Sequence, residues 1–372
     1  TNVAETSLTV PAIRYVIDSG LARVKRYSYR NKVEQLQVEP ISPAACNQRA
    51  GRCGRVANGT CIRLFDEKDF AGRPRFTDPE ILRSSLAGVI LRMKSLRFGA
   101  VEDFPFLEEP PRKAIADGYA LLGELNAVDD FNELTPIGTE LARLPLDPRV
   151  GRMILEARER NCLTEVLVIA SALSGQDVRD RPMEQAQAAD EKHRKFDDER
   201  SEFMGYLKLW KWLDLSRAGA SDGLDLDAAR IAPRPPRGAS AHARHGGAQA
   251  GAPAPAAAGF PTHKLSHRRY EQLLRENFVS VRRVREWRDI HSQLLIVVAD
   301  HGWQLNDAAA DYDKVHLAML AGLLGNIGQK SDEDEWYLGA RGIRFWRYPG
   351  AHLSKKPGRW IVTAELVETT RL

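Results

Sequence analysis

The apolar residues in the middle of the chain recur at helical spacing. After Asp78, and again after Asp147, they return every three or four positions, which is the period of one helical face. The two sets are Leu82, Leu86, Val89, Ile90 and Met93, and then Ile154, Ala157, Leu163, Val166, Leu167, Ala170 and Leu173. The pattern predicts that the centre of the protein is mostly helical.

A repeated signal marks the expected helix starts, in which a capping side chain precedes a proline. A Ser, Thr or Asp oxygen accepts a hydrogen bond from an otherwise unpaired amide, and proline loses no hydrogen bond at the first helical position. The signal occurs at Ser42-Pro43, Asp78-Pro79, Thr135-Pro136 and Asp147-Pro148. We therefore expect a helix to begin at each of these places.

The first eighty residues alternate between strand patterns and short helices. The run IRYVID, residues 13–18, predicts a buried strand. The run VKRYSYRNKVEQLQV, residues 24–38, predicts a hairpin that turns at Arg30-Asn31, and TCIRLF, residues 60–65, predicts a further strand. The alternation is typical of part of an α/β layer domain.

Strand patterns return in the last eighty residues. A helical run over residues 315–327 precedes RFWRY, residues 344–348, and WIVTAELV, residues 360–367. Short strands of this kind predict a small β-barrel. The fold class expected for the whole chain is therefore multidomain α+β, with a partial α/β domain, a helical middle and a small barrel.

One internal segment has the composition of a tether. Residues 232–259 contain no Leu, Ile, Val, Phe, Trp or Tyr and no acidic residue. Such a stretch cannot bury enough apolar area to offset the entropy lost on ordering. We predict a disordered insertion over residues 218–261.

Length and charge narrow the class of protein. A chain of 372 residues exceeds what one core organises, so two to four compact units are expected. The formal charge of +4 is compatible with a nucleic-acid partner without requiring one. No apolar run reaches the roughly 18 residues of a membrane span, so we expect no membrane partner and a cytoplasmic location. Because the chain begins at Thr1, we expect it to be a fragment.

The sequence offers no candidate metal site. His263 and His267 have helical spacing but lack the glutamate of an HExxH motif. The cysteines lack the CxxC spacing of structural zinc sites. They are Cys46, Cys53, Cys61 and Cys162.

Three arginines crowd one glycine-interrupted stretch. In CNQRAGRCGRVANG, residues 46–59, Arg49, Arg52 and Arg55 stand three residues apart. Guanidinium groups are planar, permanently charged forks that suit phosphate oxygens and stabilise charge developing on a γ-phosphate. The alternative is a solvated cluster at the end of a helix, where the helix dipole favours cations. Spacing alone leaves these two interpretations about even.

QRAGRCGR, preceded by TNVAETSLT at residues 1–9, resembles motifs VI and V of the DEAH/RHA family of superfamily 2 RNA helicases. The segments RYSYRNKVEQLQVEPIS and QRAGRCGRV are most similar to the bacterial HrpA type. The similarity continues through FTDPEILRSSLAGVILRM, LTPIGTELARLPLDPRVGRMILEA, DEKHRKFDDERSEF, RVREWRDIHSQL and GARGIRFWRYPGAHLSKKPGRWIVTAELVETTRL. It covers nearly the whole chain except residues 218–261.

The resemblance implies a half-site for ATP. By position, Arg52 and Arg55 would reach the ATP phosphates, and Gln48 would help order the γ-phosphate and the attacking water. Thr9 would lie near the ATP ribose, although Pro11 stands where many family members carry an acidic residue. ATP and Mg²⁺ would be bound mainly by another domain, the first RecA-like domain of the family.

The resemblance also implies RNA as a partner. Thr1 and Asn2 would meet the RNA backbone, and residues 24–38 would form the strand-separating hairpin of the family. Basic and aromatic residues of the last domain are candidates for a single strand. They are Phe345, Trp346, Lys355 and Lys356. The basic run Arg282, Arg283, Arg285 and Arg288 is either a solvated face or an RNA contact.

Domain names follow from the same resemblance. Residues 1–76 would be the end of the second RecA-like domain and residues 77–146 a winged helix. Residues 147–293 would be a ratchet-like helical domain (HA2), and residues 294–372 an OB-like domain.

The chain lacks both a GxxxxGK[ST] phosphate loop and a DEAH sequence. Our first hypothesis is therefore part of an ATP-dependent RNA helicase that needs the first RecA-like domain of the same polypeptide, and that does not hydrolyse ATP alone. The alternative is a stand-alone, non-catalytic RNA-binding module.

Overall fold

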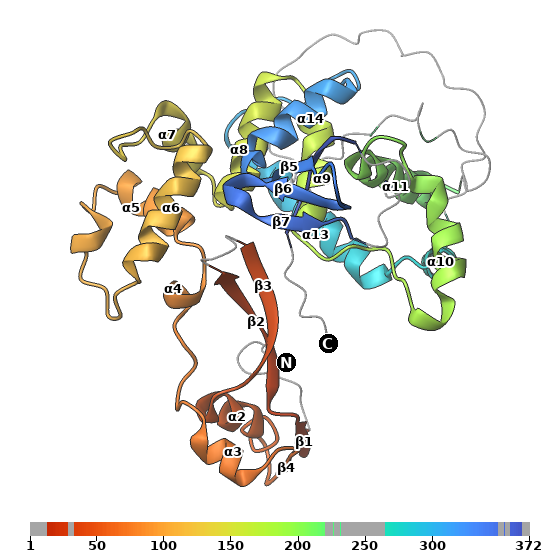
Figure 1. Cartoon of the computed structure of the whole chain (residues 1–372). Coiled ribbons are helices and arrows are strands. Elements are labelled where there is room, and N and C mark those ends of the chain that lie inside the picture. Colours follow the sequence, from red (N-terminus) through yellow and green to blue (C-terminus); the bar gives the residue numbers. More distant parts are fainter. Residues whose placement is uncertain are drawn as a thin grey trace, which may run out of the picture. The chain divides into compact units, whose positions relative to one another are not determined.

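The structure is a computed structural model that describes residues 13–28, 33–219, 226, 231, 265–348, 353 and 358–366. The chain divides into two compact units, one made of Thr1–Arg143 with Glu365–Leu372 and the other of Leu144–Ala364. Figure 1 shows a mainly helical chain with short strands near its start and its end. Apart from residues 218, 219, 226 and 231, the predicted insertion lies outside the described residues.

The described residues of the first unit form four strands, in two pairs. β1 (Tyr15–Asp18) runs parallel to β4 (Thr60–Arg63), and Tyr15 lies opposite Thr60. β2 (Leu21–Ser28) and β3 (Val33–Pro40) form an antiparallel hairpin. The expected hairpin is thereby confirmed, although its turn at Arg30-Asn31 lies outside the described residues.

The expectation that β1 is buried is wrong. Tyr15 and Ile17 are 73% and 70% exposed, whereas Asp18 is almost completely buried. Successive side chains of a strand point to opposite faces, so Tyr15 and Ile17 share the exposed face of the β1–β4 pair, whereas Asp18 lies on the other face, against α2. The buried residue of this strand is Asp18, whose carboxylate accepts a hydrogen bond from Arg49.

The helices of the first unit are short. They are α2 (Pro43–Ala50), α3 (Glu67–Gly72), α4 (Glu80–Arg83), α5 (Ala87–Ser95), the single 3-10 turn η1 (Val101–Asp103), α6 (Arg112–Glu124) and α7 (Pro136–Arg143). Ser42 caps α2 by accepting from the Ala45 amide over 3.2 Å. Thr135 accepts from the Gly138 amide over 3.0 Å at the start of α7. Both predicted caps are confirmed.

Asp78 does not cap the helix that follows it. α4 begins at Glu80 and has no side-chain cap, and the Asp78 carboxylate accepts instead from the Arg26 guanidinium, 3.2 Å away on β2. The single helix expected after Asp78 is also divided, because α4 ends at Arg83 and α5 begins at Ala87. The chain therefore bends where the apolar spacing predicted continuity.

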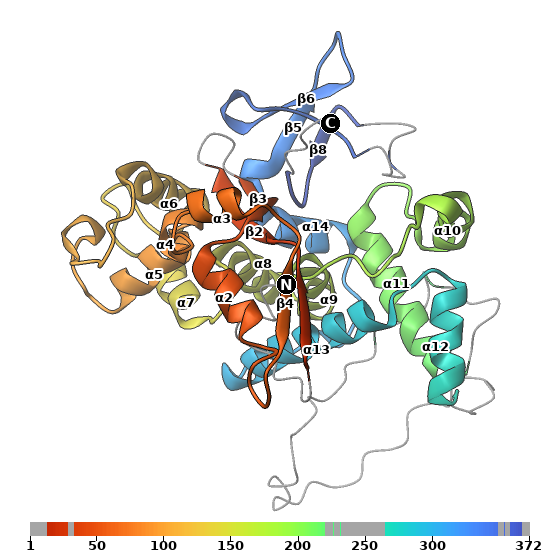
Figure 2. The same cartoon turned by 90° about the horizontal axis from the view of Figure 1, so that it is seen from below.

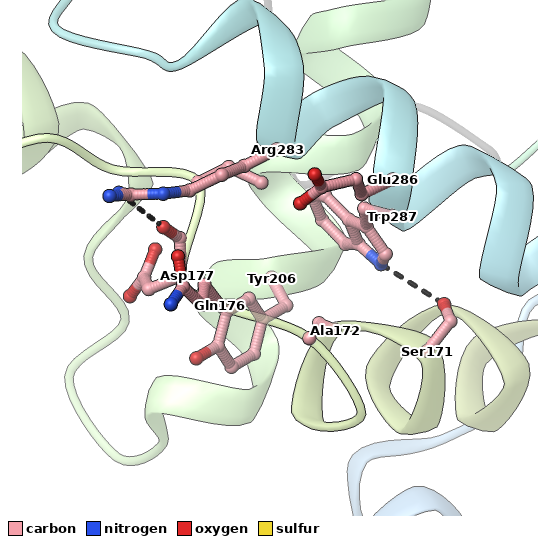
Figure 3. Close-up of a pocket in the computed structure, with 10 residues that line it drawn as sticks. Ser171, Ala172, Gln176, Asp177, Tyr206, Arg283, Glu286 and Trp287 are labelled. Atoms are coloured by element: carbon pink, nitrogen blue, oxygen red, sulfur yellow. Dashed lines mark hydrogen bonds between the residues drawn. The ribbon is translucent and has the colours of Figure 1, made fainter. Parts of the chain in front are cut away.

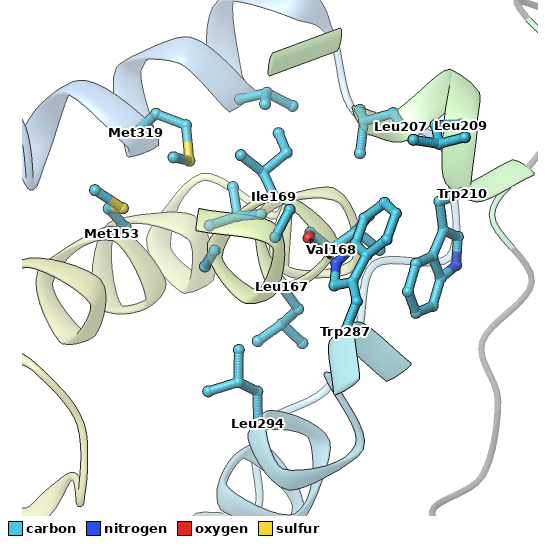
Figure 4. Packing of buried hydrophobic residues seen from close by; sticks show 14 of the residues in the cluster. Met153, Leu167, Val168, Ile169, Leu207, Leu209, Trp210, Trp287, Leu294 and Met319 are labelled. Atoms are coloured by element: carbon cyan, nitrogen blue, oxygen red, sulfur yellow. Dashed lines mark hydrogen bonds between the residues drawn. The ribbon is translucent and has the colours of Figure 1, made fainter. Parts of the chain in front are cut away.

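The second unit is built around one apolar cluster. Its helices are α8 (Pro148–Glu159), α9 (Leu163–Leu173), α10 (Ala186–His193), α11 (Glu202–Arg217), α12 (His267–Glu276), α13 (Val281–Asp300) and α14 (Tyr312–Ala321), with 3-10 turns η2 (Met183–Gln185), η3 (Arg194–Phe196), η4 (Leu324–Asn326) and η5 (Ala340–Gly342). α9 lies at the centre, and every residue from Leu163 to Ala172 is buried. Figure 4 shows Leu167, Val168 and Ile169 among side chains from the neighbouring helices. The cluster also buries a polar link, because the Trp287 indole N–H donates to the Val168 carbonyl over 3.1 Å.

Asn161 explains why the apolar pattern after Asp147 forms two helices instead of one. Its φ of 56° lies in the left-handed region, where asparagine is one of the few residues tolerated, and α8 ends just before it. The predicted cap is confirmed, since Asp147 accepts from the Arg149 amide over 2.9 Å. All the predicted core residues from Ile154 to Ala170 are buried.

The second unit ends in a four-stranded antiparallel sheet with the order β7-β6-β5-β8. Its strands are β5 (Ile327–Lys330), β6 (Trp336–Gly339), β7 (Arg344–Trp346) and β8 (Trp360–Val362). Asn326 fastens the end of β8, because its side-chain amide donates to the Thr363 and Ala364 carbonyls over 3.0 and 3.2 Å. Among the described residues β7 and β8 are the two edges, so closure into a barrel stays a prediction. Figure 2 shows β5, β6 and β8 beyond α14.

Candidate functional site

The arginine-rich stretch begins on helix α2, and Arg49 points inward from that helix. The Arg49 guanidinium donates to the Asp18 carboxylate over 2.9 Å and to the Leu21 carbonyl over 3.1 Å. The Gly20 amide donates to the same carboxylate oxygen over 3.0 Å. Arg49 is therefore a buried residue that fixes α2 to the end of β1, and it is not one of three equivalent surface charges.

The backbone after α2 continues in tight turns before it leaves the helix. The Arg52 amide donates to the Arg49 carbonyl over 3.1 Å, and the Cys53 amide donates to the Ala50 carbonyl over 3.2 Å. Arg52 is half-buried in this turn, whereas Gln48 and Arg55 are exposed. The structure thus separates the three arginines into a buried anchor, a half-buried side chain and an exposed one.

Glycines have unequal roles in this stretch. A Cβ on Gly59 would lie 2.3 Å from the Cys53 carbonyl oxygen, so only glycine fits there. A Cβ on Gly54 would meet nothing within 4 Å, and Gly54 does not have the positive φ of a left-handed helix cap. The residue that lets the chain fold back over Cys53 is therefore Gly59, and Gly54 is not required for this turn.

Arg63 is a basic residue near this stretch that the sequence analysis did not single out. Its guanidinium donates to the Asn47 side-chain oxygen over 2.8 Å and lies 4.3 Å from the centre of the Phe70 ring. Arg63 ends β4, and Asn47 precedes Gln48 on α2. The contact could have been suspected only from the pairing of β4 with β1, which places the end of β4 beside Asp18.

Two cysteines of this region, Cys46 and Cys61, remain thiols. Burial raises the pKa of Cys46 and of Cys61, which keeps both groups protonated near neutral pH. All four cysteines are free of disulfides. The chemistry that this surface can offer is therefore that of guanidinium and amide groups, which bind anions and orient water but do not act as nucleophiles.

The other predicted site residues lie outside the described residues. They are Thr1, Asn2, Thr9, Lys355 and Lys356. Their roles stay predictions, as do those of Gln48, Arg52 and Arg55. Phe345, a candidate for contact with a single strand, is instead a core residue that lies 5.9 Å from the Tyr337 ring. Trp346 beside it is exposed.

The arginines of the basic run on α13 form ion pairs with acidic residues of the same chain. Arg283 pairs with Asp180 at 2.7 Å, and Arg288 pairs with Asp214 at 2.9 Å. Arg282 and Arg285 pair with Glu286 and Glu271. Arg283, Arg285 and Arg288 thereby connect α13 to the loop before η2, to α12 and to α11, whereas the Arg282 pair lies within α13. The run therefore serves packing between helices more than it forms a free cationic surface.

A narrow pocket beside α13 is too small for a ligand. It is lined by residues that include Ser171, Asp177, Tyr206, Arg283 and Trp287, and its volume of about 10 Å³ is that of one water molecule. Figure 3 shows Arg283 and Trp287 on one side of it, donating to the Asp177 carbonyl and to the Ser171 hydroxyl. Burial raises the pKa of Tyr206 to about 12, so its phenol stays protonated.

A known protein family matches part of the helical core of the second unit. Residues 147–209 match the family model of the helicase associated domain (HA2), ratchet-like. This match begins at the capped start of α8 and ends within α11. In the part of the chain that the structure describes, none of the helices is long and apolar enough to cross a membrane.

The whole chain aligns with two bacterial relatives. It is 46% identical to the ATP-dependent RNA helicase HrpA of Escherichia coli strain K12. It is 43% identical to the ATP-dependent RNA helicase HrpA homolog of Haemophilus influenzae. Both alignments cover 100% of this chain, which spans 26% of the length of each relative. The match along the entire chain, together with the ratchet-like domain, shows that the chain belongs to the HrpA family of DEAH-type helicases.

Proposed function

We propose that this chain is part of an ATP-dependent RNA helicase that couples ATP hydrolysis to movement along RNA and to unwinding. The names of the two relatives support this reading, since both are ATP-dependent RNA helicases. The chain itself has no phosphate loop and no DEAH sequence. It would therefore act together with a first RecA-like domain of the same polypeptide, which would bind Mg²⁺ and cradle the triphosphate.

The observation that carries the proposal is the Asp18–Arg49 pair. The buried pair fixes α2, and the backbone after α2 is held by the turn from Ala50 to Cys53. The exposed Gln48 and Arg55 and the half-buried Arg52 are thereby presented from a rigid base. A rigid base is what an anion-binding arginine needs, because less entropy is then lost when it contacts a phosphate.

The roles of individual residues follow the family motif. Arg52 and Arg55 would stabilise the charge that develops on the ATP phosphates, and Gln48 would help orient the attacking water. Thr9 would approach the ribose. Thr1, Asn2, Lys355 and Lys356 would contact RNA.

The domain identities belong to the same proposal. The first unit would contain the end of a RecA-like domain, up to residue 76, and nearly all of a winged helix over residues 77–146, whose residues 144–146 belong to the second unit. The second would contain the ratchet-like domain and an OB-like domain. The β2–β3 hairpin would separate strands, and the fixed base of that hairpin, where Arg26 joins Glu39 and Asp78, suits a rigid wedge.

The test is the ATPase rate of the polypeptide that includes the preceding RecA-like domain. Arg55→Ala should lower turnover by about 10³-fold or more while RNA affinity stays nearly unchanged, because arginines that stabilise phosphoryl-transfer charge contribute on the order of 10³ to 10⁵ in rate. Lys68→Ala is the matched control. It removes an exposed positive charge from α3 of the same unit, outside the arginine-rich stretch, and should leave the rate unchanged.

An unchanged ATPase rate in Arg55→Ala would contradict the phosphate role. The alternative of a non-catalytic RNA-binding module would be favoured if the polypeptide with its preceding domain bound RNA but hydrolysed no ATP. Titrations of RNA at several salt concentrations would report how many phosphates the chain contacts. The logarithm of the affinity falls linearly with the logarithm of the salt concentration, and the slope is proportional to that number.

A further inference from the structure

The four-stranded sheet of the second unit has two unlike faces. Tyr337 and Phe345 lie opposite each other on neighbouring strands and are buried. The residues next to them in sequence alternate to the other face of the sheet. Because Trp336 lies opposite Trp346, these two tryptophans share that other face.

The strand register places a third tryptophan on the same face. Trp360 of β8 lies opposite Gln329, which lies opposite Leu338, which in turn lies opposite Arg344. Directly opposed residues of antiparallel strands point to the same face. Three tryptophans and one arginine are thus distributed over the three strands β6, β7 and β8.

These tryptophans contribute little to the core. Trp346 and Trp360 are 65% and 61% exposed, and they lie on the two strands that form the edges of the sheet among the described residues. Tryptophan stabilises a fold mainly through the large area that it buries. A face that displays two of them to solvent gains little stability from them, and the neighbouring Leu338 is 44% exposed as well.

Trp336 contacts two neighbouring side chains. Its indole N–H donates to the Asp334 carboxylate over 3.0 Å, and the Arg344 guanidinium lies 4.6 Å from the centre of its ring. Arg344 therefore adds a planar cationic group to the aromatic face. The nearby carboxylate of Glu335 is already paired with Lys330 and Arg347, both at 3.4 Å, so part of the negative charge of this turn is compensated.

We propose that this face, formed by Trp336, Trp346, Trp360 and Arg344, is a stacking surface for two or three unpaired bases of a single-stranded RNA. Every base has a π face that stacks on an indole, and a guanidinium adds a cation–π contact and a partner for the phosphate. Four-stranded sheets with aromatic side chains on the open face bind RNA bases in this manner. The inference rests on RNA being the ligand of the protein, as proposed above.

The experiment measures binding of the full chain to a fluorescein-labelled oligouridine of 12 nucleotides by anisotropy at low salt. Trp346→Ala and Trp360→Ala should each raise Kd by about 5- to 150-fold, which corresponds to the loss of one base–aromatic stack. Trp346→Phe should restore most of the affinity because it keeps a π face. Met183→Ala is the control, since it removes an exposed apolar side chain elsewhere in the same unit.

The leucine variants separate stacking from a merely apolar contact, such as docking of a protein. Trp346→Leu and Trp360→Leu should bind as weakly as the alanine variants. If they bound RNA as tightly as the unaltered chain, or if the alanine variants did, the stacking surface would be refuted. Absence of any binding by the unaltered chain at low salt would refute it too.

The proposed function is judged separately. Loss of ATPase activity in Arg55→Ala does not depend on the tryptophans, so unaltered RNA binding by the tryptophan variants would leave the helicase proposal standing. Conversely, an Arg55→Ala protein with full ATPase activity would remove the phosphate role while the stacking surface could still be measured.

Discussion

Arg49 and Asp18 form an ion pair of 2.9 Å whose side chains are only 6% and 0% exposed. Removing one partner of a buried pair leaves the other charge buried and alone, which costs about 3–5 kcal/mol. Arg49→Met should therefore lower the free energy of local opening around α2 and β1 by about that amount. Hydrogen exchange of the backbone amides of α2 and β1 measures it.

Arg14→Met is the control for this prediction, because Arg14 is an exposed residue just before β1. Its exchange rates should match those of the unaltered chain. Equal protection of α2 in Arg49→Met and in the unaltered chain would show that the pair does not anchor the helix.

Gly59 and Gly54 form a matched pair for a second prediction. Gly59→Ala should push the loop away from Cys53, because the new Cβ would lie 2.3 Å from the Cys53 carbonyl oxygen. Cys53 is only 3% exposed in the unaltered chain, so in Gly59→Ala it should react faster with iodoacetamide. Mass spectrometry of the modified peptide measures this rate. Gly54→Ala should leave the reactivity unchanged, since its Cβ meets open space. Equal labelling of Cys53 in both variants would contradict the prediction.

Phe345 and Trp346 are neighbours on β7 with opposite environments. Phe345→Ala should destabilise the sheet of the second unit by about 3–5 kcal/mol, which is the usual loss for removing a buried aromatic ring. Trp346→Ala should change the free energy of unfolding by less than about 0.5 kcal/mol, because its side chain is exposed. Urea unfolding followed by hydrogen exchange in β5 and β6 distinguishes the two. A similar loss in both variants would place Trp346 in the core.

Two histidines give the second unit a pH-dependent stability. Burial lowers the pKa of His193 and of His316 below the ordinary value of 6.5. The His193 ring is 3.1 Å from the Phe278 carbonyl, and the His316 ring lies 2.6 Å from the Ser201 hydroxyl and 2.7 Å from the Tyr312 carbonyl. Both contacts of His316 suit a neutral ring that donates from Nδ1 and accepts at Nε2.

The direction of the pH effect follows from these lowered pKa values. Well above pH 6.5 the rings are neutral in both states and contribute no pH dependence. As the pH falls below 6.5, the unfolded chain takes up protons first, so the free energy of unfolding decreases until the lower folded-state pKa is reached. Urea unfolding at pH 7.5 and 5.5 should show this loss, and His193→Gln and His316→Gln should each show a smaller one. An equal loss in the variants would assign the effect to other groups.

Local signals in the sequence predicted the helix caps well, and long-range contacts decided where they failed. Ser42, Thr135 and Asp147 each cap a helix, because a cap requires only residues within one turn. Asp78 has the same local sequence, yet its carboxylate is taken by Arg26, which lies 52 residues earlier. Nothing in the sequence around Asp78 could reveal that competitor.

The same distinction separates what the sequence indicated about the candidate site from what it could not. The arginine spacing identified the stretch, but the inward turn of Arg49 depends on Asp18, 31 residues away. The strands β5 and β6 were missed because each has only four residues and includes a glycine, so their apolar alternation is too short to recognise. The break at Asn161 follows from one backbone angle within an otherwise continuous apolar pattern.

The long helix α13 has a practical consequence for dividing the protein. It runs unbroken from Val281 to Asp300, about 30 Å, and therefore passes straight through the domain limit that we expected at residue 293. A fragment ending at residue 293 would lack the last turns of α13, which carry Leu294, Leu295 and Val298. These three residues are buried in the apolar cluster. Such a fragment would expose the apolar side chains of α9 that α13 covers, and we expect it to precipitate or misfold. The helix α14 adds Val315, Ala318 and Met319 to the same cluster, so an expression boundary belongs after Leu323, the last buried residue of the cluster.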